Sequence, residues 1–278
     1  MTTLIVNADD FGLSESVNRG IVDAHTDGIV TSTTWLAGGD AADEAVELAP
    51  PGLEVGLHLA LTSVRPIGDP GPFRSILDDA GRWPSGYGSV IRWMLTTSDA
   101  RRLIRAEWRA QLYRFRTRWG RLPSHLDSHQ HVALIPGLMR VYVELAAESG
   151  IQAIRAPREV RDLGDLPGPH AFHRPQETLV LSRLADRPRG LARRAGVSVP
   201  DSFAGFRQSG RMDEATLLKL LPRLAERGGT VELMVHPGEA DEPSGYLRRQ
   251  ERDALMSPKV RDALAIHGLQ LGRFSSLL

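Results

Sequence analysis

The first 61 residues alternate short apolar runs with amphipathic helical stretches, and this alternation constrains the fold more than any other feature. Strands that alternate with helices usually pair in parallel, because each helix carries the chain back across the sheet. The sequence therefore predicts an α/β fold built on a parallel sheet. The expected order is a strand at Leu4–Val6, a helix at Glu15–Asp27, a strand at Ile29–Leu36, a helix at Ala41–Leu48 and a strand at Leu53–Leu61.

The alternation continues to the end of the chain, with two interruptions. Residues 62–97 begin with a stretch rich in proline, glycine and aspartate, and residues 158–205 show weak periodicity. We interpret both as loop excursions from one domain spanning residues 1–278, with about seven parallel strands in all. Further helices are expected at Ile91–Trp119, Met139–Glu148, Val180–Ala185, Asp213–Glu226 and Lys259–His267, and further strands at His125–Ser128, Ile151–Arg155, Thr230–Val235 and Leu269–Phe274.

Charge and cysteine content exclude several classes of function. The 278 residues include 34 Lys+Arg and 34 Asp+Glu, so the bulk charge gives no case for nucleic acid binding. Without cysteine the chain has no disulfide, no thiolate nucleophile and no cysteine-ligated zinc. No apolar run approaches the ~20 residues of a membrane span, and no signal-peptide pattern precedes the first strand. These features lead us to expect a cytoplasmic protein.

Polar side chains that can bind a metal or move a proton stand where four of the expected strands end. Because the carboxyl ends of parallel strands meet at one edge, we expect these residues to lie together. Two histidines and one carboxylate with open coordination positions form a catalytic metal set. Taken singly, each of these four strand ends has a plainer explanation, as a helix cap, a core histidine, a polar loop or a turn. The four places are Asp9-Asp10, His58, the run His125–His131 (HLDSHQH), and His236 before Pro237-Gly238.

Five motifs together resemble those of the YdjC/ChbG family of carbohydrate deacetylases. The resemblance extends from residue 4 to about 238, although no motif covers about 158–200. It implies a (β/α) barrel related to the polysaccharide deacetylases, here a seven-stranded, incomplete TIM-like parallel barrel. It also implies hydrolysis of a linear amide, in which an acetyl group leaves an N-acetylated amino sugar with the aid of a divalent metal. The motifs are Asn7–Gly12 (NADDFG), Gly28–Thr34 (GIVTSTT), Gly56–Leu59 (GLHL), His125–His131 and His236–Gly238 (HPG).

The same resemblance implies a role for each strand-end residue. Asp10, His58 and His129 fall at the metal-ligand positions. Asp9 falls at the position of the catalytic base, and His236 matches the histidine proposed as the acid. The residue types suit this chemistry, because a metal lowers the pKa of a bound water toward ~7, a carboxylate can accept a proton, and an imidazole can protonate a leaving nitrogen.

Neighbouring residues are expected to support the site. We expect His125 and Asp127 to orient a ligand imidazole, and His131 to do the same or to act as an alternative ligand. The loop at 62–84 is expected to form a wall or lid over the sugar, or a contact in a homodimer. Sugar rings often lie on aromatic faces, although ordinary packing is the expected role of at least two of the aromatic candidates. The candidates for substrate contact are Phe11, Trp35, Phe73, Trp83 and Arg155.

Other functions stay open at this point. A relative acting on a hopanoid-type glycolipid precursor would carry out the same deacetylation, and a sugar-binding protein would keep the fold without the chemistry. The two-His-one-carboxylate iron(II) oxygenases share the ligand set, but they are all-β barrels, whereas helices alternate with strands here. Mixed nitrogen and oxygen ligation suits Zn²⁺, Fe²⁺ or Mn²⁺, with Mg²⁺ and Co²⁺ as further options.

Overall fold

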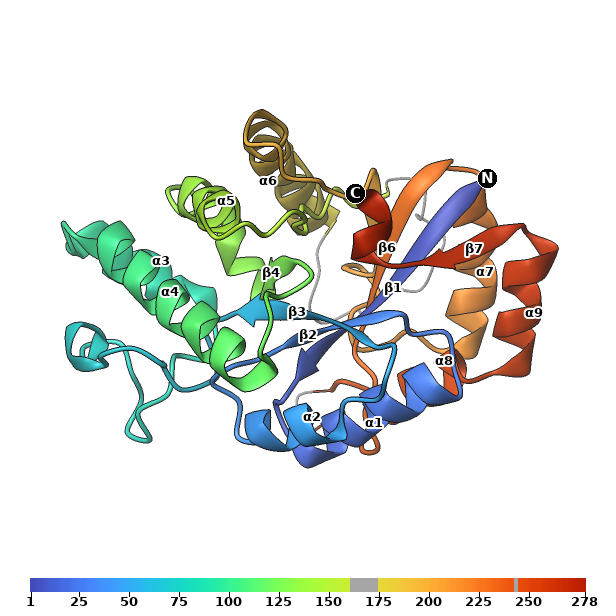
Figure 1. Ribbon diagram of the computed structural model, residues 1–278, viewed down its shortest axis with the longest axis horizontal. Helices are drawn as coiled ribbons and strands as arrows, with labels where there is room; N and C mark the ends of the chain where they lie inside the picture. Colours follow the sequence, from blue (N-terminus) through green and yellow to red (C-terminus); the bar gives the residue numbers. More distant parts are fainter. Residues whose placement is uncertain (161–174, 243–244) are drawn as a thin grey trace.

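Seven parallel strands form the sheet of this protein, as the sequence predicts (Figure 1). The computed structural model describes residues 1–160, 175–242 and 245–278, and all counts refer to these residues. The strands lie in the order β4-β3-β2-β1-β6-β5, and β7 pairs with the beginning of β1. Their bounds are β1 Thr2–Phe11, β2 Ser32–Trp35, β3 Glu54–Leu59, β4 Leu126–Ser128, β5 Ser202–Ala204, β6 Gly229–Val235 and β7 Leu269–Gly272.

Strand β1 is the centre of the sheet. It pairs with β6 along Thr2–Ala8, while its other edge pairs first with β7 and then, from Asn7 onward, with β2. Because it has neighbours on both edges, β1 is buried over nearly its whole length, which explains its continuous apolar run. The carboxyl end of β1 therefore lies in the middle of the sheet.

The sheet curls into an incomplete barrel, which confirms the expected fold class. Isolated bridges join Leu126 of β4 to Ile154, Ala153 to Ser198, and Glu159 to Phe203 of β5. The strand expected at Ile151–Arg155 is thus reduced to single bridges instead of a regular ladder. These bridges lie between β4 and β5, the two ends of the strand order.

Nine helices cover the curled sheet in the described residues. Helices α3 and α4 lie at one end of the molecule, whereas α7 and α9 lie at the other (Figure 1). None of the described helices combines the length and hydropathy needed to cross a membrane. The bounds are α1 Glu15–Thr26, α2 Ala42–Leu48, α3 Tyr87–Thr96, α4 Ala100–Trp119, α5 Met139–Glu148, α6 Pro175–Arg194, α7 Glu214–Ala225, α8 Arg248–Leu255 and α9 Pro258–Ile266, with 3₁₀ turns at Gly71–Phe73, His129–Leu134 and Phe274–Leu277.

The helices differ from the sequence expectation in three places. The region expected as one helix at Ile91–Trp119 is split, because α3 ends at Thr96 and α4 begins at Ala100. Helix α6 is longer than the expected Val180–Ala185, and part of the excursion before it, 161–174, lies outside the described residues. The sequence does not predict α8, because five of its eight residues are charged and no clear apolar stripe marks it.

The loop after β3 is packed against the body of the protein. Phe73 and Trp83 are buried, with ring centroids 4.7 Å apart, and the ring of Trp93 lies 5.3 Å from that of Phe73. A carboxylate of α4, Glu107, accepts hydrogen bonds from the backbone N–H groups of residues 67 and 68. These contacts anchor parts of the loop against α3 and α4.

Candidate active site

The end of β1 buries two adjacent carboxylates, Asp9 and Asp10. Regular strand alternation would direct neighbouring side chains to opposite faces. Here Asp10 has a φ of 75°, and the register between β1 and β2 shifts between Ala8 and Phe11. This distortion of the strand lets both carboxylates reach the same cluster of charged side chains.

Asp10, His58 and His129 bring their potential ligand atoms together. Oδ1 of Asp10 lies 3.0 Å from Nδ1 of His129 and 3.5 Å from Nε2 of His58. The two imidazole rings meet edge to face, with centroids 5.4 Å apart. One ligand atom from each of the three residues lies within 4.8 Å of the others. The ends of β1, β3 and β4 thus converge, as parallel strands require.

Asp127 contacts the ring of His58. Nδ1 of His58 lies 2.6 Å from Oδ1 of Asp127, so this nitrogen carries a proton and Nε2 faces Asp10. The hydroxyl of Thr34 donates to the other oxygen of Asp127 at 3.0 Å. Burial opposes protonation of His58, but the carboxylates of Asp127 and Asp10 outweigh it and raise the pKa of His58 to about 10.

Arg155 holds the second carboxylate of the pair, Asp9. Its two terminal nitrogens lie 2.6 and 2.7 Å from the two oxygens of Asp9, and its Nε lies 2.6 Å from Glu232. A further contact of 2.8 Å joins it to Asp127. Burial alone would raise the pKa of Asp9, but the guanidinium outweighs it and holds that pKa well below its usual range. Arg155, expected at the substrate, is instead enclosed by three carboxylates.

Arg248 holds Asp10 in a similar way. Its Nη2 lies 2.7 Å from Oδ2 of Asp10, and its Nε donates to Glu242. Burial would raise the pKa of Asp10, but Arg248, with hydrogen bonds from His129 and His58, holds it well below its usual range. Because Arg248 occupies one oxygen of Asp10, the other oxygen is directed at the two histidines.

His236 follows β6 and completes the set of strand-end groups. It is buried, and its Nδ1 has no hydrogen-bond partner in the part of the chain that is described. Its backbone N–H donates to the carboxylate of Glu251. Burial lowers the pKa of His236 to about 4, although the charges of Asp10 and Asp9 act in the opposite direction. The imidazole is therefore neutral near pH 7 and has a free ring nitrogen.

His125 and His131 lie apart from the ligand atoms. The ring of His125 stacks on Phe274, with centroids 3.5 Å apart, and its Nδ1 lies 2.9 Å from Oγ of Ser124. The sequence led us to expect that His125 orients a ligand imidazole, but its ring packs in the core instead. His131 lies against the ring of Phe203, and burial lowers its pKa to about 3. Neither histidine belongs to a metal-ligand group among the described residues.

The aromatic candidates for a sugar platform are packed inside the protein. Phe11, Trp35, Phe73 and Trp83 are each exposed by 2% or less. Trp35, for example, packs edge to face on Phe115 of α4. None of the four presents a ring face to solvent, so the alternative of ordinary packing explains all of them better than a sugar contact.

Three buried charges of this cluster are absent from the sequence expectations. Glu232 has a local signal, since it is the one charged residue in β6, where a buried charge needs a partner. Arg248 and Glu251 have no such signal, because both lie on the charge-rich helix α8. Only the packing of α8 against the end of β6 shows that they are buried.

The donor set fits a divalent metal. Two imidazole nitrogens face one carboxylate oxygen, and Asp127 and Arg248 fix the orientation of two of the three ligands. A cation among these atoms would accept an electron pair from each of the two imidazoles and from the carboxylate. Because the pKa of His58 is about 10 without a metal, metal binding near pH 7 would displace its proton.

The chain resembles known proteins over nearly its whole length. A solved structure of a putative cellobiose-phosphate cleavage protein from Enterococcus faecalis V583 has a TM-score of 0.74 and 28% identity, covering 99% of this chain and 98% of that chain. An uncharacterized protein from Agrobacterium tumefaciens C58 shares the fold, with a TM-score of 0.56 and 13% identity over 99% of this chain and 89% of that chain. The profile of the YdjC-like protein family matches residues 3–265, and the chain therefore belongs to the YdjC-like protein family.

Proposed function

We propose that this protein is a metal-dependent carbohydrate deacetylase that removes the acetyl group from an N-acetylated amino sugar. The observation that carries the proposal is the convergence of Asp10, His58 and His129 beside an ionised Asp9 and the free ring nitrogen of His236. Sugar binding alone needs neither a proton acceptor nor a proton donor, so these two groups favour a hydrolase. The resemblance of the motifs to YdjC/ChbG carbohydrate deacetylases supports the same activity.

An N-acetylated oligosaccharide is the substrate class that we favour. The similar protein from E. faecalis is described as a putative cellobiose-phosphate cleavage protein, which supports a short saccharide, while the N-acetyl group rests on the resemblance of the motifs. An amino sugar on a glycolipid carries the same amide bond and is the alternative.

The residues of the cluster would divide the reaction between them. Asp10, His58 and His129 would hold the metal, which when bound lowers the pKa of water and polarises the acetyl carbonyl. Asp9, kept ionised by Arg155, accepts a proton from the attacking water. When the C–N bond breaks, the leaving nitrogen needs a proton, and we assign its delivery to His236. Because burial lowers the pKa of His236 to about 4, His236 would have to take up a proton during the reaction before it donates one.

The metal assignment is tested by His58→Ala and His129→Ala. We expect both variants to lose metal affinity in calorimetry and acetate release from N-acetylated chito-oligosaccharide, while circular dichroism shows an intact fold. His267→Ala is the matched control, because His267 is exposed and lies outside the cluster. Unchanged metal affinity in both variants would show that the ligand assignment is wrong.

The reaction class needs its own measurement. A chelator should abolish acetate release, and adding back Zn²⁺ or Mg²⁺ should restore it. Oxygen consumption that depends on Fe²⁺ would instead indicate an oxygenase. Sugar binding without acetate release under every metal would indicate a binding protein.

A further inference from the structure

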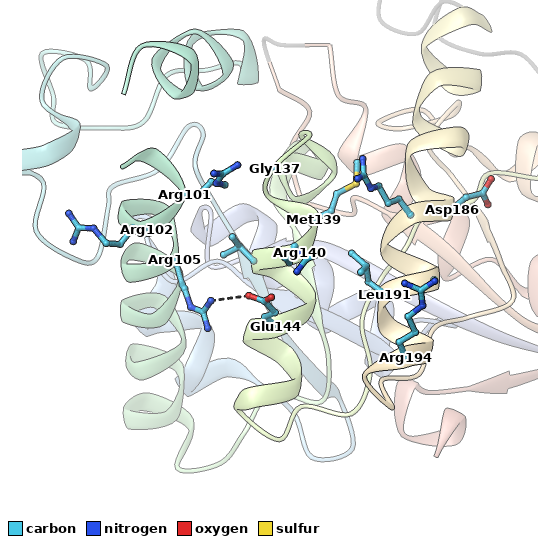
Figure 2. A pocket seen from close by; sticks show the side chains of 13 residues that line it. Arg101, Arg102, Arg105, Gly137, Met139, Arg140, Glu144, Asp186, Leu191 and Arg194 are labelled. Atoms are coloured by element: carbon cyan, nitrogen blue, oxygen red, sulfur yellow. Dashed lines mark hydrogen bonds and ion pairs between the residues drawn. The ribbon is translucent and has the colours of Figure 1, made fainter. Parts of the chain in front are cut away.

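A groove rich in arginine lies on the outer layer of helices. Helix α5 lies between α4 and α6, and a groove of about 790 Å³ is lined by all three (Figure 2). None of its lining residues belongs to the candidate active site. Two carboxylates and several small or apolar side chains also line it. Its arginines are Arg101, Arg102, Arg105, Arg140, Arg187 and Arg194.

Most of these arginines have no partner in the part of the chain that the structure describes. Arg102 pairs with Asp99, and Arg105 pairs with Glu144 (Figure 2) and with Glu148. The remaining four are exposed, and their side chains form no ion pair or hydrogen bond within the described ranges. Because the whole chain has zero formal net charge, the fold concentrates positive charge here. The four are Arg101, Arg140, Arg187 and Arg194.

The positive charges are spread along the groove. Arg187 and Arg194 share a face of α6 with Leu191, and seven residues of α-helix span about 10 Å. Arg101 and Arg140 add charge from α4 and α5. One small anion does not reach over this length, so the matching ligand carries several anionic groups in a row.

An apolar hollow of about 710 Å³ continues the groove. It shares Arg101 and Gly137 with the groove and is lined by Ile91, Met94 and Leu95 of α3, among others. Leu95 is 83% exposed, which is unusual for a large apolar side chain. An occupant that fits both parts therefore combines an apolar anchor with a run of negative charge.

We propose that the arginine groove and the apolar hollow together bind an acidic segment of a partner protein. An apolar side chain of the segment enters the hollow beside Leu95, and its carboxylates lie along the unpaired arginines. A nucleic acid strand would use the arginines only, since no aromatic side chain lines either part to stack a base. A flat anionic membrane would not enter a concave hollow.

A fluorescent peptide with a pair of leucines followed by a run of glutamates tests this proposal with the full-length protein. Anisotropy should show binding that weakens as salt is added. The double variant Arg140→Gln/Arg194→Gln should bind it about tenfold more weakly, because two charge pairs are lost. Arg116→Gln is the matched control, since Arg116 is an exposed arginine of α4 outside the groove. Its affinity should equal that of the unmodified protein.

A second variant, Leu95→Ser, tests the hollow. It should lower the affinity for the leucine-containing peptide about threefold to tenfold. The affinity for a peptide of glutamates alone should stay unchanged. Acetate release should stay unchanged in all these variants.

Four results would overturn the proposal. The first is equal peptide binding, or none, in the unmodified protein and the double variant. The second is that oligothymidylate binds more tightly than the acidic peptide and that Leu95→Ser does not change its affinity, which would indicate nucleic acid. The third is binding confined to phosphatidylserine vesicles, which would indicate a membrane. The fourth is a dimer that the double variant abolishes, which would assign the surface to a second copy of this chain.

Discussion

Arginine has different roles in two regions of this protein. At the strand ends, Arg155 and Arg248 are buried, and each contacts at least two carboxylates. In the groove between α4 and α6, four exposed arginines have no carboxylate partner among the described residues. A buried charge is strongly destabilising unless it is paired, whereas an exposed one keeps its water. The buried arginines therefore hold Asp9 and Asp10 in place, and the exposed ones stay available for another molecule.

The largest effect is expected from Arg155→Met. The variant leaves the carboxylates around it, including Asp9 and Glu232, without their cation. Breaking a buried pair in this way should lower the free energy of unfolding by about 3–5 kcal/mol, measured by urea denaturation. Arg116→Met is the exposed control and should change the free energy of unfolding by less than ~0.5 kcal/mol. A loss below ~1 kcal/mol in Arg155→Met would mean that the buried pairing contributes little.

Asp9→Asn separates the two adjacent carboxylates. It keeps the shape of the side chain but removes its basicity, so kcat should fall by roughly 10²–10⁴-fold while metal affinity is retained. Asp10→Asn should instead lose metal affinity, because Asp10 faces both histidines. If Asp9→Asn keeps the unmodified kcat with metal bound, the proton acceptor is another group, and His236 is the first candidate.

Glu159 sharpens the comparison, because backbone N–H groups hold this buried carboxyl and, among the described residues, no arginine forms an ion pair with it. Burial raises its pKa to about 7 from 4.5, against the effect of the Arg207 and Phe206 N–H groups. The folded protein therefore keeps a proton that the unfolded chain releases. The stability from this group is fully present below pH 4.5 and is lost as the pH rises through about 7.

Glu159→Gln measures that contribution. As the pH rises from about 5 to about 8, the ionisation of Glu159 should lower the free energy of unfolding by on the order of 3 kcal/mol. The Gln variant should not show this contribution to the pH dependence. Urea denaturation of both proteins at the two pH values gives the difference. An identical pH dependence would mean that Glu159 ionises normally in the fold.

The smallest effect is expected from Arg140→Gln/Arg194→Gln. Because both side chains are exposed and unpaired, the free energy of unfolding should change by less than ~0.5 kcal/mol. Thermal and urea denaturation test this directly. A loss of roughly 2 kcal/mol or more is typical of losing a buried contact. Such a loss would show that the groove arginines stabilise the fold.

The parts of the fold and site that follow local sequence rules could be predicted. The expected helix at Met139–Glu148 matches α5 in full, because its apolar spacing and its end at Gly150 are local signals. That the polar ends of the strands meet follows from the parallel order, since parallel strands end at one edge, whereas the choice of Asp10, His58 and His129 among those residues came from the family resemblance. Helix α8 could not be predicted in the same way, because it is charge-rich and its apolar face is short. The break between α3 and α4 had a local signal that was overlooked, since Asp99 is the N-cap of α4.

By itself, the sequence determined that the chain alternates strands with helices and that its metal-binding residue types stand at strand ends. Only the tertiary structure decided how each charge is paired. Arg155 ends an expected strand and Arg140 lies in an expected helix, but no local signal shows that carboxylates enclose Arg155 while Arg140 faces solvent. The same holds for His125, which stacks in the core three residues before Ser128 ends β4, and His129, which reaches Asp10. The physical reason is that burial and pairing depend on residues that are remote in sequence, and these set both the pKa and the role of an ionisable group.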